Sequence, residues 1–154
     1  MLYFAYGSNL NNFQMKRRCK DSIFLKKINL KDFRLTFRSK YRAADIEAKK
    51  NSIVPGALFE ISKNDEKKLD VYEDFPILYK KYYFTYYEKK IMTYTMTKKT
   101  LFTYPTERYL NVIKCGYKDC NLDGKYLKKA LVSIWFISVK DFRICLIKKL
   151  IFFC

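Results

Sequence analysis

The stretch Leu2-Tyr3-Phe4-Ala5-Tyr6-Gly7-Ser8-Asn9-Leu10 joins an apolar run to a set of small polar residues. Its first half, Leu2–Tyr6, is aromatic and β-prone, which predicts a buried strand. Gly7, Ser8 and Asn9 then predict a turn, because glycine accepts unusual backbone angles and short polar side chains bond nearby backbone groups. Such a turn can direct several backbone N–H groups at one anion. The same residues are also common in ordinary strand-ending turns, and the sequence leaves both interpretations open.

The rest of the chain adds strands and helices in an irregular order. Five further segments rich in β-branched and aromatic residues are predicted as strands: Ile23–Ile28, Phe33–Phe37, Ile53–Ile61, Tyr82–Tyr87 and Ile91–Met96. A turn or bulge is expected at Asn29–Asp32, and a hairpin turn at Glu88–Lys90. Helices are predicted to begin at Asn11 or Asn12, Ser62, Pro105 and Asp123. Because strands and helices do not alternate regularly, we expect an α+β fold with a mixed, largely antiparallel, curved sheet.

The composition excludes several kinds of active site. The 154 residues suit one domain, and 49% hydrophobic residues are enough for a core. The sequence has no histidine, which excludes Ser/His/Asp and Cys/His nucleophiles and most zinc sites. Only 4 glycines are present, which excludes a Walker-type phosphate loop. Acid–base chemistry must therefore use Asp, Glu, Lys, Tyr or Cys side chains.

The formal net charge of +17 suggests nucleic acid or an anionic membrane as a partner. The lysines and arginines are distributed as single residues and pairs along the whole chain, however, which is typical of a solvated surface. The excess of Lys, Ile, Asn, Tyr and Phe is also what an AT-rich genome would produce. No RNP-like motif accompanies the charge, so we rank a nucleic-acid-binding protein below the other functions.

The cysteines and the most apolar segment bear on location. The 5 cysteines form no C-x-x-C motif, and their odd number favours free, buried thiols in a reducing compartment. No basic segment precedes Leu2–Tyr6, so no signal peptide is expected. Val132–Ile137 is the most apolar stretch, and it is shorter than the about 20 residues that span a bilayer. We expect a cytoplasmic protein with no membrane partner.

A second segment, Leu69-Asp70-Val71-Tyr72-Glu73-Asp74-Phe75-Pro76, interrupts the basic pattern with three carboxylates. On a helix, Leu69 and Glu73 share one face, so a buried Leu69 would turn Glu73 toward the interior. A carboxylate beside aromatic side chains would have a raised pKa and could exchange protons near neutral pH. The alternative is a frayed helix end whose solvated acids pair with nearby lysines.

Four segments in the same order resemble the γ-glutamylcyclotransferase family in its small, bacterial, AIG2-like form. They read YFAYGSNL from Tyr3, VPGALFEI from Val54, LDVYE from Leu69, and YLNVIKCG from Tyr109 with Leu122 and Tyr126 after it. The resemblance covers about residues 2–131. We therefore expect one domain over residues 1–131, and we treat residues 132–154 as a divergent apolar C-terminal segment rather than a separate domain.

The resemblance implies a compact, barrel-like mixed sheet flanked by helices, with no cofactor and no metal. It also implies that a small γ-glutamyl compound is the partner of a monomer or homodimer. The α-amine of this compound would attack its own γ-carbonyl, which releases 5-oxoproline and a free amine. By the resemblance, Glu73 is the general acid and base. The residues that would hold the substrate are Tyr6, Gly7, Ser8, Asn9, Leu10, Tyr79 and Tyr109. For the last two, core packing is the alternative role.

The chain departs from the family pattern at Pro55, Asp74, Tyr117 and Asn121. Asp74 stands where glycine commonly follows the glutamate, so the turn after this helix is expected to be tight or strained. Such substitutions motivate an alternative function, a module that binds γ-glutamyl ligands without turnover. The resemblance ends after residue 131, and the segment 132–154 is expected to be a divergent last helix or strand, or the product of a shifted reading frame.

Overall fold

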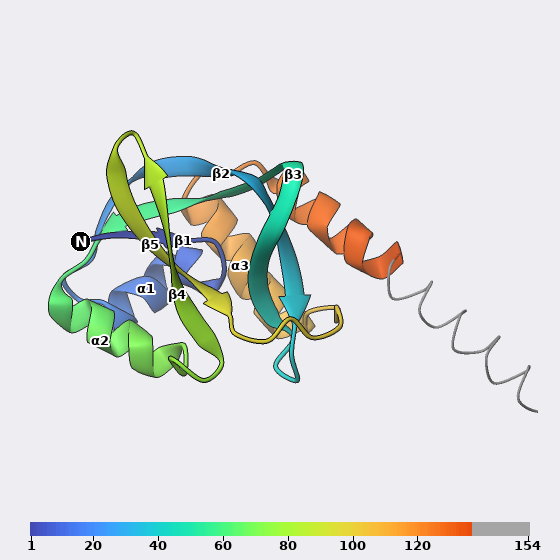
Figure 1. The fold of residues 1–154 in the computed structure, drawn as a ribbon, viewed down its shortest axis with the longest axis horizontal. Helices are drawn as coiled ribbons and strands as arrows, with labels where there is room; N and C mark the ends of the chain where they lie inside the picture. Colours follow the sequence, from blue (N-terminus) through green and yellow to red (C-terminus); the bar gives the residue numbers. More distant parts are fainter. Residues whose placement is uncertain (137–154) are drawn as a thin grey trace, which may run out of the picture.

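The computed structural model describes residues 1–136, which form one five-stranded sheet with helices packed against it (Figure 1). The strands are β1 (Leu2–Ala5), β2 (Ile23–Arg38), β3 (Ala43–Glu60), β4 (Tyr79–Tyr86) and β5 (Lys89–Met96). Their order across the sheet is β2-β3-β1-β5-β4. β1 pairs with β5 in parallel, and the other three pairs are antiparallel. The predicted α+β class with a mixed, largely antiparallel sheet is confirmed.

The sheet curves but is not closed into a barrel, because β2 and β4 remain as its two edges. Figure 1 shows the long strands β2 and β3 bending together across the molecule. The register shifts between Lys31 and Phe33, where Asp32 has a left-handed backbone with a φ of 59°. Across the pair, Asn51 donates its N–H to Asp32 Oδ1 at 2.8 Å. Between the pairs Lys31–Ile53 and Phe33–Ala48, β3 has four residues, 49–52, opposite the single residue Asp32 of β2. Extra residues in one strand bend and twist a strand pair, which accounts for the curvature here.

Several predicted strand boundaries are corrected by this pairing. The two separate strands Ile23–Ile28 and Phe33–Phe37 are parts of the single strand β2, and the expected turn or bulge between them corresponds to the register shift at Asp32, where the extra residues belong to β3. The strand predicted at Ile53–Ile61 begins ten residues earlier, at Ala43. Residues 49–51 are exposed and polar, so this part of β3 lacks the apolar alternation that identifies a strand.

The hairpin of β4 and β5 turns on two residues rather than three. Tyr87 and Glu88 both have left-handed backbone angles, with φ of 46° and 62°. Two consecutive residues of this kind form the type I′ turn that suits the twist of a hairpin. Lys89 and Lys90, which were expected in the turn, belong to β5 instead.

The helices begin at cap residues. They are η1 (Ser8–Leu10), α1 (Asn12–Arg18), α2 (Lys63–Tyr72) and α3 (Glu107–Asp119), and residues 124–136 are also helical. Asn11 caps α1 and Ser62 caps α2, as predicted, by accepting from the N–H of Gln14 and Asp65. The cap of α3 is Thr106. Pro105 therefore precedes this helix and does not begin it.

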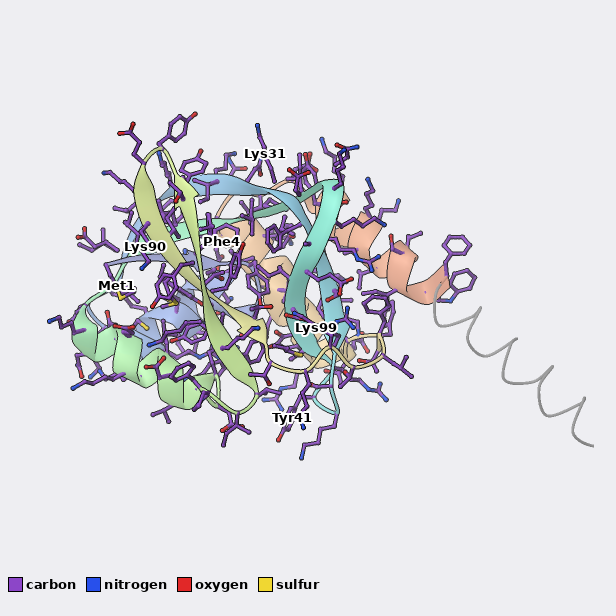
Figure 2. All side chains as sticks on the ribbon, in the orientation of Figure 1. Met1, Phe4, Lys31, Tyr41, Lys90 and Lys99 are labelled. Carbon is purple, nitrogen blue, oxygen red and sulfur yellow. The ribbon has the colours of Figure 1, made fainter. Side chains whose placement is uncertain are left out.

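The core lies between the sheet and the helices, with Phe4 near its centre and Lys31 and Tyr41 at the rim (Figure 2). Two glycines allow close approach inside it. A Cβ atom at Gly56 would lie 2.3 Å from the carbonyl oxygen of Ala5, and one at Gly116 would lie 2.5 Å from Leu10 Cβ. All four glycines of the chain lie in the described part, and none of them has a positive φ. Close packing, rather than unusual backbone angles, therefore requires glycine at these two positions.

The helical residues 124–136 pack onto this core through Leu127, Ala130 and Ile134. The helix predicted to begin at Asp123 is present. It crosses the expected domain boundary at residue 131 without a break. The rest of the predicted C-terminal segment, residues 137–154, lies outside the described residues. Within residues 1–136, no helix is both long enough and apolar enough to cross a membrane.

Candidate active site

The chain leaves β1 and enters η1 directly, which places the loop residues at one cavity. The carbonyl oxygen of Gly7 accepts the first hydrogen bond of η1, from the Leu10 N–H at 3.0 Å. Ser8 and Asn9 are buried and line the cavity together with Tyr6 and Gly7. Leu10 is fully buried in the core and is not among the lining residues.

Helix α2 brings Glu73 to this loop. Leu69 is fully buried, which is the condition under which Glu73 is expected to turn inward, and the N–H of Glu73 donates to the Leu69 carbonyl oxygen at 2.8 Å. Glu73 is therefore the C-cap of α2, and its side chain turns inward. The next residue, Asp74, has a φ of 50°, a region that aspartate and asparagine tolerate better than most residues. The expected tight turn is present, and aspartate is suited to it.

Asn9 links Glu73 to the loop. Its Nδ2 donates to Glu73 Oε1 at 2.9 Å and to the hydroxyl of Tyr3 at 2.8 Å. Its Oδ1 accepts a hydrogen bond from the guanidinium of Arg18. Because a guanidinium has donors and no acceptor, this contact determines which end of the Asn9 amide faces Glu73.

Arg18 lies at the rim of the site, in the last turn of α1. Its guanidinium stacks 3.5 Å from the centroid of the Tyr72 ring, a cation–π contact. It also donates to Ser8 Oγ at 3.3 Å and to Gln14 Oε1 at 2.6 Å. A fixed cation is thus held near Glu73, although the two side chains form no salt bridge in the described structure.

The Glu73 carboxyl is partly buried, and its proton affinity follows from that position. Burial raises its pKa from 4.5 to about 7, while Arg18 and the Asn9 hydrogen bond lower it. A carboxyl with a pKa near 7 exists in both forms at neutral pH, so it can take a proton and return it. The alternative of acids paired with nearby lysines applies to Asp70, which accepts from Lys81 at 2.9 Å.

Two predicted tyrosines meet on the backbone of Ala44 in β3. Tyr79 donates its hydroxyl to the Ala44 carbonyl oxygen at 2.6 Å, and the Ala44 N–H donates to the Tyr109 hydroxyl at 3.2 Å. A Cβ atom on Gly7 would lie 3.2 Å from Ala44 Cβ and 3.5 Å from the Tyr109 hydroxyl. The loop, the tyrosines and β3 are therefore packed tightly against one another.

One small cavity collects these side chains. Its lining residues are Tyr3, Tyr6, Gly7, Ser8, Asn9, Ala44, Glu73, Tyr79, Tyr94 and Tyr109. Every predicted site residue except Leu10 is among them. Tyr3, Ala44 and Tyr94 were not predicted as site residues. Tyr3 stands in the stretch that opens the chain, whereas Tyr94 arrives through the parallel pairing of β1 with β5, which no local pattern indicates.

The other departures from the family pattern lie away from Glu73. Asn121 has a φ of 50°, so it occupies a left-handed position that asparagine tolerates. Pro55 is buried in β3 opposite Asn29 and lines a groove that shares no residue with the Glu73 cavity. Tyr117 is buried in α3. Over residues 1–136, no group of three or more His, Cys, Asp or Glu side chains is arranged to hold a metal ion.

Comparisons with known proteins agree with these motifs. The family model described as "Gamma-glutamyl cyclotransferase, AIG2-like" matches residues 3–117. A solved γ-glutamyl cyclotransferase is 25% identical with a TM-score of 0.70, and the match covers 84% of this chain and 85% of that chain. The human uncharacterized protein loc79017 is also 25% identical, with a TM-score of 0.68 and the same coverage. YkqA from Bacillus subtilis, 21% identical with a TM-score of 0.69, shares the fold over 86% of this chain and 54% of its own. None of the curated proteins compared matches the sequence.

Proposed function

Because the chain belongs to the γ-glutamyl cyclotransferase, AIG2-like family, we propose that it releases 5-oxoproline and a free amine from a small γ-glutamyl compound. The observation that carries this proposal is the state of Glu73. Its carboxyl is partly buried, has a pKa of about 7, and is held by Asn9 in a cavity lined with tyrosines. A carboxyl of this kind supplies the proton transfers that the reaction needs.

The reaction is an intramolecular aminolysis. The Glu73 carboxylate takes a proton from the α-ammonium of the substrate, and the resulting amine attacks the γ-carbonyl carbon. A C–N bond forms, and the electron pair of the C=O bond moves to the oxygen. When this pair returns, the bond to the leaving amine breaks, and Glu73 gives its proton to that nitrogen. The Glu73 carboxylate then takes the second proton that the ring nitrogen must lose and passes it to the free amine, so that 5-oxoproline keeps one N–H and Glu73 returns to its carboxylate form. All atoms of both products come from one substrate, so no co-reactant is consumed.

Positioning is the second contribution of the site. The substrate must fold so that its amine meets its own carbonyl, and holding two reacting groups together can lower a barrier greatly. Tyr79 and Tyr109 are fixed to the Ala44 backbone, so the cavity wall is rigid. The N–H groups of Ser8 and Asn9 precede the first hydrogen bond of η1, and a helix start of this kind can donate to the carboxylate or carbonyl of the substrate.

The alternative, a module of the same fold that binds without turnover, has little support at the substituted positions. Asp74 and Asn121 adopt left-handed backbone angles that these two residue types tolerate. Pro55 lines a different groove from Glu73. None of the four substituted positions, Pro55, Asp74, Tyr117 and Asn121, lines the Glu73 cavity.

The test is release of 5-oxoproline from a panel of γ-glutamyl amino acids, γ-glutamyl peptides and γ-glutamyl amines. We expect the wild-type protein to release it from at least one member. Glu73→Gln keeps the size of the side chain and removes the titrating group, so its rate should fall about 10²–10⁴-fold.

The matched control for this change is Glu60→Gln. Glu60 is exposed at the end of β3 and does not line the cavity, so this variant should keep the wild-type rate. An inert wild-type protein that binds a member of the panel would favour the module without turnover. Full activity in a folded Glu73→Gln protein would exclude the mechanism.

A further inference from the structure

Five tyrosine hydroxyls line the Glu73 cavity, and their hydrogen bonds divide them into two groups. Three donate their hydrogen to a fixed protein acceptor. Tyr6 donates to the carbonyl oxygen of Tyr94 at 2.7 Å, and Tyr79 donates to that of Ala44 at 2.6 Å. Tyr94 donates to Asp70 Oδ1 at 2.6 Å. The hydrogens of these three hydroxyls are therefore occupied before a substrate arrives.

The remaining two hydroxyls each accept a hydrogen bond. Tyr3 accepts from Asn9 Nδ2 at 2.8 Å, and Tyr109 accepts from the N–H of Ala44 at 3.2 Å. The Ser8 hydroxyl also lies within hydrogen-bonding reach of Tyr109, whereas Tyr3 has no acceptor for its own hydrogen among residues 1–136. A phenol can both accept and donate, so Tyr3 has one hydrogen left for a ligand.

The direction of the bond at Tyr3 follows from its neighbours. Arg18 can only donate, so the Asn9 oxygen must face it and the Asn9 NH₂ group must face Glu73 and Tyr3. Both hydrogens of that NH₂ group are then used, one by each partner. Tyr3 is thus fixed as an acceptor toward Asn9, and its hydrogen points elsewhere in the cavity.

We propose that Tyr3 is a catalytic residue that donates its hydroxyl hydrogen to the γ-carbonyl oxygen of the substrate as this oxygen becomes negatively charged. The inference rests on the function proposed above. During ring closure the C=O electron pair moves to the oxygen and later returns, which expels the amine. The hydrogen stays on Tyr3 throughout, so no additional proton transfer is needed.

The geometry of Asn9 supports this assignment. Its two N–H bonds diverge, so the Glu73 oxygen and the Tyr3 oxygen, at 2.9 and 2.8 Å from the same nitrogen, lie about 5 Å apart. In the closing ring, the nitrogen and oxygen on the γ-carbon are about 2.3 Å apart, as their bond lengths require. Hydrogen bonds of about 2.8 Å on each side can therefore connect Glu73 to the nitrogen and Tyr3 to the oxygen at once.

The surroundings of Tyr3 keep it a donor. Its side chain is 3% exposed, and burial raises the pKa of its hydroxyl well above the ordinary value of 10, with Glu73 as a second cause. The hydroxyl therefore stays protonated over the whole range in which Glu73 titrates. A preorganised donor in a dry site stabilises a developing oxyanion more than it stabilises the neutral carbonyl of the bound substrate.

The test compares steady-state kinetics of 5-oxoproline release in Tyr3→Phe and the wild type. Phenylalanine keeps the ring that packs on Tyr94 and removes only the hydroxyl. The kcat should fall about 10²–10³-fold, with KM changed by less than about threefold, since the donor acts on charge that exists only in the transition state. Tyr117→Phe is the matched control, because this buried tyrosine lies outside the cavity and should keep both constants.

Thermal unfolding of each variant separates loss of folding from loss of catalysis. Protein with 3-fluorotyrosine at position 3 retains the hydroxyl, so it should keep kcat even if the Tyr3→Phe protein does not fold. A Tyr3→Phe protein with a raised KM and an unchanged kcat would overturn the inference, because the hydroxyl would then bind a group whose charge does not change. An inert wild-type protein would overturn the proposed function, and the role of Tyr3 with it. Activity in the wild type with none in Glu73→Gln, but full kcat in Tyr3→Phe, would overturn the role of Tyr3 alone.

Discussion

Two carboxylates near the tyrosine cavity have very different surroundings. Glu73 is partly buried and, among residues 1–136, accepts one hydrogen bond, from Asn9. Asp45, the residue after Ala44, is fully buried and has four partners: it accepts hydrogen bonds from Thr95, Met96 and Lys99, and Arg38 lies beside it as a second cation. The Glu73 carboxylate thus has one hydrogen-bond donor among the described residues, whereas the Asp45 carboxylate has three. The number of partners therefore distinguishes a carboxylate suited to proton transfer, Glu73, from one with a structural role, Asp45.

The partners of Asp45 come from three parts of the chain. Its Oδ1 accepts from the hydroxyl of Thr95 at 3.0 Å and from the N–H of Met96 at 2.9 Å. Its Oδ2 lies 2.7 Å from Lys99 Nζ and 3.5 Å from Arg38 Nε. These contacts connect β3 to β2, to β5 and to the segment after β5, so the Asp45 carboxylate stabilises the packing of these parts of the fold.

The largest effect on stability is expected when the Asp45 carboxylate is removed. Asp45→Ala leaves the buried Arg38 without this partner and the Met96 N–H without an acceptor, so the free energy of unfolding should fall by about 3–5 kcal/mol. Urea unfolding measures it, with Glu60→Ala as the exposed control. A loss below about 1 kcal/mol would mean that the Asp45 contacts contribute no more than a surface pair.

The second effect is a gain in stability, which we expect when Glu73 is replaced by glutamine at alkaline pH. The pKa of Glu73 is about 7 when folded and about 4.5 when unfolded, so the folded state binds its proton more tightly. Its contribution to stability is therefore complete below about pH 4.5 and is lost as the pH rises to 7. Glu73→Gln has no such loss, so relative to wild type it should be more stable at pH 8 than at pH 4, by about 3 kcal/mol.

Urea unfolding at pH 4 and pH 8 measures this difference, with Glu60→Gln as the control at both values. If the Gln variant were equally stable relative to wild type at the two pH values, Glu73 would have no raised pKa in the folded protein.

The third effect concerns the single donor of Glu73. Asn9→Ala removes a hydrogen bond that lowers the pKa of this carboxyl, so the pKa should rise further. The free energy of a hydrogen bond to a charged group corresponds to about one pKa unit, so the acidic limb of the pH–rate profile should move up by about one pH unit. The profile of kcat/KM for 5-oxoproline release checks this. A limb that stays in place would show that Asn9 does not act on Glu73.

The smallest effect is expected from the cation at the rim. Arg18 lowers the pKa of Glu73 without pairing with it directly, and its side chain is partly exposed. Arg18→Met should therefore move the same limb upward by only about half a pH unit, because solvent screens the interaction. The neighbouring Arg17 is exposed, so Arg17→Met is the matched control and should leave the limb unchanged. An equal shift in both variants would indicate a general effect of net charge.

Local patterns predicted much of this molecule. The caps at Asn11 and Ser62 and the inward turn of Glu73 all follow from interactions within one helix or its ends. The strand leading into the loop at Gly7 follows from the contrast between an apolar run and small polar residues. Such features need no knowledge of the rest of the chain.

Features that depend on distant pairing were not predictable. The first ten residues of β3 are held by pairing with β2 across the register shift at Asp32, and residues 49–52 among them are polar. Because that part was not recognised as a strand, the contact of Ala44 with two tyrosines was not foreseen. Tyr94 reaches the cavity through the parallel pairing of β1 and β5. The partners of Asp45 likewise come from three segments that are distant in the sequence, so its hydrogen bonds were not predictable.

The account depends most on one property, a Glu73 carboxyl that titrates near neutral pH and carries the protons of the reaction. The most direct test is the pH dependence of kcat/KM for 5-oxoproline release by the wild-type protein. On the acidic side, kcat/KM should rise about tenfold per pH unit and level off near pH 7, where Glu73 becomes ionised. A profile that is flat from pH 5 to 8, or that levels off near the ordinary carboxyl value of 4.5, would contradict it.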